Sequence, residues 1–141
     1  MERKNVLFLD EEKWFTNLYL EYSKSEPFKI IVANTPKEFF EKINDQMCYD
    51  LFILDIMIPL SLFDNEDLNH LTRPQKQLLE GGLNVGIVFY DILRKIPKYK
   101  NIPVIFYTAK ADPEIADDPY YWYISKPVTW PVLFNQIKKH L

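Results

Sequence analysis

The chain has little glycine, a single cysteine and no long apolar run, and each shortage excludes a class of protein. Only 3 of its 141 residues are glycine and 48% are hydrophobic, so we expect a packed core rather than a disordered chain. One cysteine, Cys48, cannot form an internal disulfide, which is typical of a reducing compartment. Because no apolar stretch is long enough for a signal peptide or a membrane span, the composition predicts a cytoplasmic protein.

The chain also lacks an excess of positive charge. Its formal net charge of -3 offers no electrostatic attraction for a phosphate backbone, so we expect no direct nucleic-acid binding and no membrane partner. A length of 141 residues leaves room for one domain, which we place at residues 1–141 with no output domain beside it.

The most informative stretch is residues 51–59, where an apolar run leads directly into a carboxylate. Leu51 to Leu54 are continuously apolar, a pattern typical of a strand buried on both faces in the middle of a parallel sheet. Asp55 follows at the carboxyl end of this strand, and Pro59 ends the apolar stretch behind it. Open α/β sheets place their chemistry at the carboxyl ends of their strands, so we expect Asp55 to lie in the functional site.

Strand and helix patterns alternate along the rest of the chain. Short apolar runs predict further strands at residues 6–9, 28–33, 103–107 and 120–124. Helical spacing predicts amphipathic helices with these apolar faces: Trp14, Phe15, Leu18, Tyr19 and Tyr22; Phe39, Phe40, Ile43 and Met47; Val85, Val88, Phe89, Ile92, Leu93 and Ile96; and Trp130, Leu133, Phe134, Ile137 and Leu141. Because crossovers between parallel strands are right-handed, this alternation predicts an α/β fold, a doubly wound five-stranded parallel sheet with helices on both faces. The alternation alone does not give the strand order, which we expect to be the flavodoxin-like 2-1-3-4-5.

Threonines mark the expected starts of three helices. Thr35 is followed by a proline and then by Glu38, which together predict an N-cap with a capping box. Thr72 and Gln75 predict a second capping box, and Thr129 is expected to cap the last helix. These caps locate helix starts that apolar spacing alone leaves open.

Two segments depart from a simple alternation. Residues 61–82 are too long for a connection between a strand and a helix, so we expect an insertion with one or two short helices and a stop at Gly81-Gly82. Its acidic residues Asp64, Glu66 and Asp67 are expected to form a solvated loop face, with a second metal site as the alternative. Residues 109–119 are polar and contain two prolines, so any helix there must be short.

Residues that can handle a metal and a phosphate follow four of the five predicted strands. They are Asp10 with Glu11, Asp55, Thr108 and Lys126. Carboxylates held close together repel one another and stay ionised only if a cation joins them. An oxygen-rich set without sulfur or histidine suits Mg²⁺, while a lysine and a threonine hydroxyl can contact phosphoryl oxygens. The set predicts a phosphoryl-transfer site with a carboxylate nucleophile.

In these positions the chain resembles the CheY-like receiver domains of two-component response regulators. The matching pieces are Leu9-Asp10-Glu11-Glu12, Leu54-Asp55-Ile56-Met57-Ile58-Pro59, Ile105-Phe106-Tyr107-Thr108-Ala109 and Ser125-Lys126-Pro127. Each piece follows a strand, and they occur in the family's order. Glu11 stands where an aspartate is commoner in the family, and the insertion and the short interval before Lys126 are further departures.

The resemblance implies a role for each site residue. Asp55 would be the phosphoacceptor, with Thr108 and Lys126 on the phosphoryl oxygens and Thr108 and Tyr123 as the conformational switch. Asp10, Glu11, Asp55 and the backbone carbonyl of Met57 would hold Mg²⁺, and the Lys126–Pro127 bond would be cis. The implied partners are a histidine kinase or phosphotransfer protein and a downstream protein target. Such a domain catalyses only its own phosphorylation and dephosphorylation, so it is not an enzyme in the ordinary sense.

Other readings stay open at this point. Taken singly, Asp10 and Asp55 could be ordinary caps, Lys126 a solvated charge and Tyr123 plain packing. Taken together, they could still belong to a receiver that no longer accepts phosphate and serves as a protein-binding module. A phosphohydrolase with an aspartyl-phosphate intermediate is a poorer fit, because Met57 stands where those enzymes carry a second aspartate. The insertion is further expected to form a lid or a docking element over the site.

Overall fold

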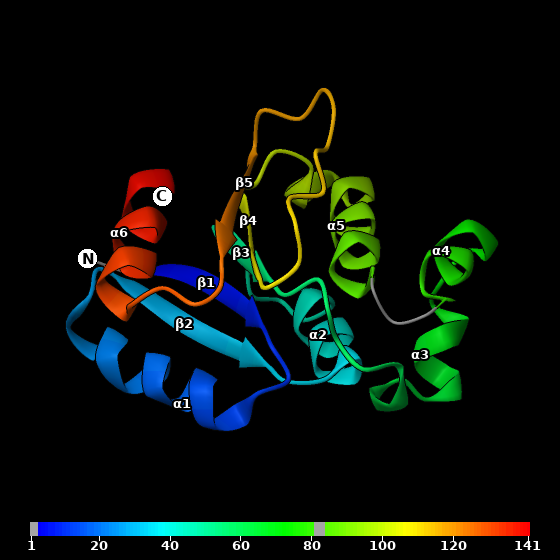
Figure 1. Cartoon of the computed structure of the whole chain (residues 1–141), viewed down its shortest axis with the longest axis horizontal. Coiled ribbons are helices and arrows are strands. Elements are labelled where there is room, and N and C mark those ends of the chain that lie inside the picture. Colours follow the sequence, from blue (N-terminus) through cyan, green and yellow to red (C-terminus); the bar gives the residue numbers. More distant parts are fainter. Residues whose placement is uncertain (1–2, 81–83) are drawn as a thin grey trace.

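Five parallel strands form one sheet in the order β2-β1-β3-β4-β5, which confirms the predicted fold (Figure 1). The computed structural model describes residues 3–80 and 84–141. The strands are β1 (Lys4–Leu9), β2 (Phe28–Ala33), β3 (Leu51–Leu54), β4 (Val104–Thr108) and β5 (Tyr121–Ser125). Every described neighbour pair is parallel, so the carboxyl ends of all five strands lie along one edge.

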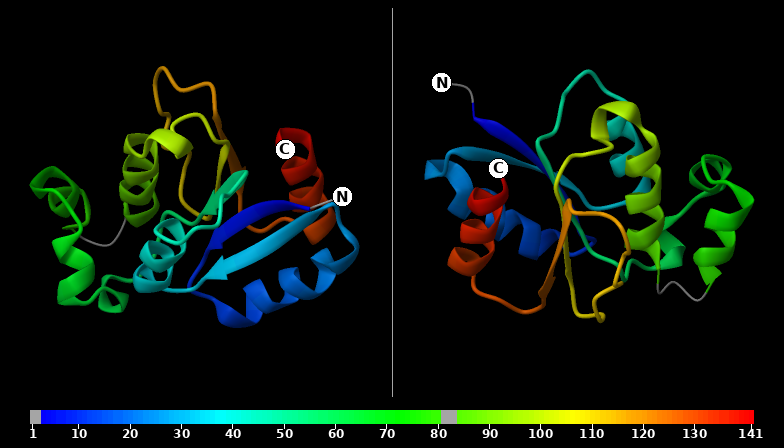
Figure 2. Two further views of the ribbon diagram at one scale, coloured as in Figure 1. Left: turned by 180° about the vertical axis from the view of Figure 1, so that it is seen from behind. Right: turned by 90° about the horizontal axis from the view of Figure 1, so that it is seen from above.

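Helices cover both faces of the sheet, as Figures 1 and 2 show. On one face lie α1 (Lys13–Tyr22) and α6 (Trp130–His140), and on the other α2 (Pro36–Ile43) and α5 (Val85–Lys95). Short 3₁₀ turns follow α1 (Ser23–Ser25), β3 (Leu60–Leu62) and α5 (Pro97–Tyr99). None of the helices in the described ranges has the length and hydropathy needed to cross a bilayer.

The core has two halves because successive strand residues point to opposite faces. Leu7, Phe52 and Phe106 pack on the side of α2 and α5, while Phe8, Ile53 and Tyr107 pack on the side of α1 and α6. All four residues of β3 are fully buried, as their continuous apolar run predicts. Asp55 therefore follows a strand that is buried along its whole length.

The apolar stripes of α1 and α6 are less buried than helical spacing predicts. Tyr19 is buried, but Trp14 is 65% exposed, Tyr22 is 43% exposed and Trp130 is 40% exposed. The rings of Tyr22 and Trp130 stack on each other with centroids 5.2 Å apart, so the two helices share an exposed aromatic surface. We also expected Leu18, Met47 and Leu141 to lie on buried helix faces. That prediction is wrong, because all three side chains are exposed.

The three predicted helix caps lie at the expected residues, but two of them differ in their hydrogen bonds. Thr35 accepts a hydrogen bond from the Glu38 backbone N–H, as predicted, but the Glu38 carboxylate reaches back to Asn34 N rather than to the cap residue. Thr72 and Gln75 form a complete capping box. Thr129 stands at the N-cap of α6, as predicted, but its side-chain oxygen accepts no capping hydrogen bond.

The insertion contains two short helices, α3 (Asn65–Asn69) and α4 (Arg73–Leu78), as expected. They lie outside α2 and α5 rather than across the strand ends, which does not fit a lid over the site (Figures 1 and 2). Asp67 is buried and forms a capping box with Asp64, so this part of the acidic segment is not a solvated face. The expected stop at Gly81-Gly82 lies outside the described residues.

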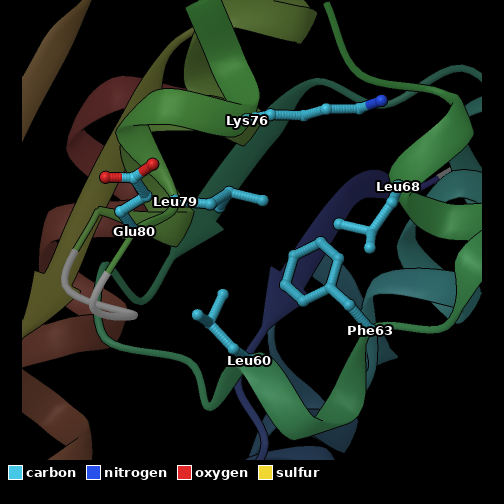
Figure 3. Close-up of a pocket in the computed structure, with 6 residues that line it drawn as sticks. All are labelled: Leu60, Phe63, Leu68, Lys76, Leu79 and Glu80. Atoms are coloured by element: carbon cyan, nitrogen blue, oxygen red, sulfur yellow. The ribbon is translucent and has the colours of Figure 1, made fainter. Parts of the chain in front are cut away.

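An apolar hollow of about 230 Å³ lies between the pieces of the insertion. Figure 3 shows the side chains of Leu60, Phe63, Leu68 and Leu79 converging on it, with the stem of Lys76 along its upper rim. α4 is also tied to α5, because Gln75 Nε2 donates to Asp91 Oδ2 at 2.9 Å. The insertion thus has apolar contacts of its own and a polar anchor on the main body.

The connection from β4 to β5 contains no helix in the described structure, which agrees with the expectation that any helix there must be short. It is held to α5 by Arg94, whose Nε bonds to Asp118 at 2.8 Å. The same guanidinium donates to the carbonyls of Tyr99, Ile102 and Tyr120. Arg94 thus ties the end of this connection, at Asp118 and Tyr120, to the segment between α5 and β4, at Tyr99 and Ile102.

The start of α5 packs directly on the backbone beside Asp55. Gly86 is buried in the first turn, and its N–H donates to Ile56 O at 3.1 Å. A Cβ atom at this position would lie 2.7 Å from Ile56 Cα and 2.9 Å from the Asp55 carbonyl carbon. Only glycine allows so close an approach, and α5 thereby fixes the segment that follows β3.

We expect Gly86→Ala to lower the free energy of unfolding by about 2 kcal/mol, because the new methyl group must displace backbone atoms. Urea unfolding of the two proteins measures the change. An exposed substitution on another helix, Lys13→Ala at the start of α1, is the control and should stay within about 0.5 kcal/mol. A gain of about 1 kcal/mol, as for an ordinary helical glycine, would contradict this packing.

Candidate functional site

The ends of three strands bring the predicted carboxylates and lysine together. Asp10 follows β1, Asp55 follows β3 and Lys126 follows β5. The backbone N–H of Asp55 donates to Leu9 O at 3.1 Å and that of Lys126 donates to Thr108 O at 2.9 Å, so the sheet pairing continues up to the site. Asp10 is fully buried and Asp55 is 5% exposed. The side chains are therefore positioned by the sheet itself.

Lys126 bridges the two aspartates. Its Nζ lies 2.6 Å from Asp10 Oδ2 and 2.9 Å from Asp55 Oδ2, and only 14% of its side chain is exposed. Burial by itself lowers the pKa of Lys126, but the carboxylates of Asp10 and Asp55 act in the opposite direction and outweigh it. The pKa consequently lies above its ordinary value, so Lys126 is a fixed positive charge between the carboxylates.

Glu11 is the third carboxylate of the cluster, and one of its oxygen atoms lacks a hydrogen bond in the described part of the chain. Its Oε2 atom is buried and has no hydrogen-bond partner among the described residues. Burial, with the neighbouring charges of Asp10 and Asp55 adding to it, raises the pKa of Glu11 to about 7. A buried carboxylate oxygen without a donor is costly, so this atom is a candidate for a further cation.

The cluster fits a divalent metal. One oxygen each from Asp10, Glu11 and Asp55 lie within 4.8 Å of one another, and among the described residues this is the one group of acidic, histidine or cysteine side chains with that property. All of these donors are oxygen atoms, which hard cations such as Mg²⁺ prefer. The expected ligand at Met57 lies two residues beyond Asp55, and Met57 N donates to Asp55 Oδ1 at 3.1 Å.

Thr108 ends β4 and Tyr123 lies within β5, and both of their hydroxyl groups bond to the backbone of Lys110. Thr108 is buried at the end of β4, and its Oγ1 accepts from Lys110 N at 3.2 Å. The Tyr123 hydroxyl donates to Lys110 O at 2.8 Å. The Lys126–Pro127 bond is cis, as expected. The structure thus gathers the carboxylates of Asp10, Glu11 and Asp55 in one cluster and pairs Lys126 with two of them. Thr108 lies at the end of β4, opposite Ser125, whereas Tyr123 lies within β5, opposite Phe106.

Several residues that the sequence did not single out support the site. Asn34 Nδ2 donates to the carbonyl of Asp10 at 2.7 Å and holds the turn after β1. The rings of Phe15 and Tyr107 lie 5.6 Å and 5.3 Å from Lys126 Nζ and supply cation–π contacts. Apolar spacing marked Phe15 as part of a helix face, but no sequence pattern relates it to a lysine so far along the chain.

Comparisons with known proteins give a consistent result on the fold. No protein-family model and no curated protein matches the chain. Among solved structures, chemotaxis protein CheY4 of Vibrio cholerae superposes with a TM-score of 0.71 at 16% identity, covering 99% of both chains. The receiver domain of Francisella response regulator 1452 gives a TM-score of 0.65 at 23% identity, with 97% of this chain and 95% of that chain covered.

Two further matching structures contain the same response regulator, TrrA. Response regulator TrrA of Thermotoga maritima, in complex with Mg²⁺ and BeF, has a TM-score of 0.64 at 25% identity and covers 98% of this chain and 99% of its own. A complex of histidine kinase ThkA with TrrA matches with a TM-score of 0.64 at 24% identity and 98% of both chains covered. The chain therefore has the fold of the CheY-like receiver domains of response regulators.

Proposed function

We propose that this protein is a receiver domain in which Asp55 accepts a phosphoryl group from a phosphohistidine donor. The observation that carries the proposal is the contact of Lys126 Nζ with both Asp10 and Asp55 at the carboxyl edge of the sheet. A nearly buried aspartate beside a fixed ammonium can act as a nucleophile while the lysine receives the developing negative charge. The fold agrees with this function, because its structural neighbours are receiver domains.

The reaction transfers one phosphoryl group. A carboxylate oxygen of Asp55 attacks phosphorus, the P–N bond to the donor imidazole breaks, and the released ring nitrogen takes up a proton. The product is an aspartyl phosphate, which adds roughly -1.5 to -2 charges and three acceptor oxygens. Lys126 lies close enough to pair with these oxygens, and the Thr108 hydroxyl at the end of the neighbouring strand β4 is the next donor.

Asp10, Glu11 and Asp55 would hold Mg²⁺ together with the carbonyl of Met57. The bound ion supplies positive charge that neutralises the phosphoryl oxygens during transfer. The orphaned Oε2 atom of Glu11 supports this role, because it has the acceptor capacity that a cation needs. The longer arm of glutamate does not prevent it from joining the two aspartates in one cluster.

The proposed partners are a histidine kinase or phosphotransfer protein as donor and a downstream protein as target. The complex of TrrA with a histidine kinase supports the first partner by analogy of fold. The output would be a change in a protein-binding surface when Thr108 moves toward the phosphoryl group and Tyr123 turns. The domain would catalyse only its own phosphorylation and dephosphorylation, and we place it in the cytoplasm.

A second candidate function is a receiver that binds a partner without being phosphorylated. The connection between β4 and β5 favours it, because this region carries no helix and is clamped to α5 by Arg94. A clamp of this kind resists the movement that a phosphorylation switch requires. The two candidates differ in whether Asp55 reacts at all, which the next experiment measures.

Incubation with acetyl phosphate and Mg²⁺ should add a single phosphoryl group to the protein, detected by intact-mass spectrometry. Asp55→Asn should abolish the adduct, since the amide cannot act as the nucleophile, and withholding Mg²⁺ should reduce it strongly. Asp117→Asn is the matched control, because Asp117 is exposed and its positive φ of 60° suits asparagine. A folded protein with no adduct would support the phosphorylation-independent module instead.

Mg²⁺ affinity should rise with pH around neutrality. In the metal-free protein Glu11 has a pKa of about 7, so below that value a proton competes with the ion for this carboxylate. The apparent affinity should therefore increase about tenfold between pH 6 and pH 8 and then level off. Titration calorimetry in buffers of different ionisation enthalpy measures both the affinity and the proton released.

Glu11→Gln tests the assignment directly. The amide cannot take up or release this proton, so the variant should bind Mg²⁺ more weakly at pH 8 and lose most of the pH dependence. A pH dependence that survives unchanged in Glu11→Gln would show that another group competes with the ion. Glu12→Gln is the control, because Glu12 is exposed and lies outside the carboxylate cluster.

A further inference from the structure

A line of three exposed apolar side chains runs along α1. Trp14, Leu18 and Tyr22 follow one another at intervals of four residues, so they lie on one face of the helix. The buried residues of α1, Thr16 and Tyr19, lie on a different face. Figures 1 and 2 show α1 at the outer edge of the molecule. The helix therefore presents an apolar ridge to its surroundings.

The ridge borders a small apolar hollow at the start of α6. Tyr22 stacks on Trp130 there, and Trp130 is itself exposed. The hollow has a volume of about 160 Å³ and is lined by Phe15, Leu18, Tyr19, Tyr22, Val128 and Trp130. Contiguous exposed apolar surface of this kind is typical of protein interaction sites. We call Trp14, Leu18, Tyr22 and Trp130 together the α1 face.

The order of side chains along the ridge is the same in both directions: an aromatic ring, an aliphatic side chain and an aromatic ring. A two-fold axis at Leu18 therefore brings this residue onto Leu18 of a second copy, and Trp14 onto Tyr22 of that copy. Ridges formed by residues four apart pack against each other at a crossing angle of about 50°, the commonest angle in globular proteins. The ridge is thus complementary to itself, which a two-fold dimer requires.

The charges beside the ridge agree with antiparallel pairing. Glu12 precedes the ridge and Lys24 follows it, at equal distances along the chain from Leu18, and both are exposed. Antiparallel pairing places Glu12 of each copy near Lys24 of the other, whereas parallel pairing would place like charges together. Lys24 also pairs with Glu21 of its own chain at 2.9 Å, on the surface where such a pair is weak and can exchange partners.

We propose that the α1 face is a homodimer interface, in which a second copy of this chain packs its own α1 face in antiparallel orientation. The exposed parts of its four side chains supply roughly 400 Å² of apolar surface per copy. A standard stable interface buries about 800 Å² per partner, so the dimer is weak, with a dissociation constant on the order of 100 µM. The proposal does not depend on phosphorylation of Asp55.

Sedimentation velocity of the full chain over a concentration series measures the dimer. Leu18→Asp places two carboxylates opposite each other at the two-fold axis, and Leu18→Lys does the same with two ammonium groups. Each variant should weaken dimerisation about tenfold or more. An equal mixture of the two should restore it, because an aspartate then meets a lysine. Only a residue that faces its own copy gives this result.

Leu78→Asp is the matched control. Leu78 is 43% exposed, as is Leu18, but it lies on α4, away from the α1 face. This variant should dimerise like the wild type. An equal loss of dimer in Leu78→Asp would contradict the assignment to α1.

Cysteine cross-linking locates the axis. In a Cys48→Ser background, Leu18→Cys should form a disulfide-linked dimer under mild oxidation, because cysteines whose Cα atoms lie within about 7 Å can be bridged. Leu78→Cys in the same background should cross-link much more slowly. This readout also decides the question if Leu18→Asp fails to fold, which circular dichroism detects.

A wild type that stays monomeric up to about 1 mM would overturn the proposal and leave the α1 face to a different protein. A dimer that Leu18→Asp leaves intact would overturn it as well. So would a mixture of Leu18→Asp and Leu18→Lys that remains as monomeric as either variant alone, because Leu18 would then not face its own copy.

Discussion

The structure depends on one electrostatic constraint: three carboxylates lie at one edge of the sheet, and a single lysine holds two of them together. Asp10 and Asp55 are almost fully buried, so their charges repel strongly unless a cation lies between them. Lys126 supplies it from the end of β5, and its long side chain reaches past β4 to the ends of β3 and β1. Glu11 belongs to the same cluster, and its burial, together with the charges of Asp10 and Asp55, raises its pKa to about 7.

The same constraint explains why the neighbouring elements are rigid. A lysine can bridge carboxylates from two strands only if the strand ends keep their spacing, and α5 fixes one of them through the close approach of Gly86 to Asp55. The connection between β4 and β5 lacks a helix, and Arg94 of α5 holds its end through Asp118 and the carbonyl of Tyr120. The region beside Thr108 and Tyr123 is therefore held by side chains rather than by regular secondary structure, which allows individual bonds to be gained and lost.

Local patterns predicted much of this architecture. The strands, the Thr72–Gln75 capping box and the four residue positions at the strand ends could be inferred because each depends on a short stretch of chain. The order of the sheet was expected from the flavodoxin-like pattern, since the alternation alone does not give it. Burial was predicted less well. Apolar spacing identified the stripes of α1 and α6 but gave no information on what covers them, and Trp14, Tyr22 and Trp130 lie exposed. The location of the insertion beside α2 and α5 likewise depends on contacts between distant segments.

The sequence by itself thus determined the type of sheet and the identity of the charged residues at its edge. Only the tertiary structure decided which oxygen atoms Lys126 contacts, that Glu11 keeps a buried oxygen without a donor, and that Lys110 joins Thr108, Tyr123 and Asn84. The physical reason is the range of the interactions. Periodicity and capping act over a few residues, whereas the bonds of Lys126 join residues 71 and 116 positions apart, and the packing of the whole chain sets their geometry.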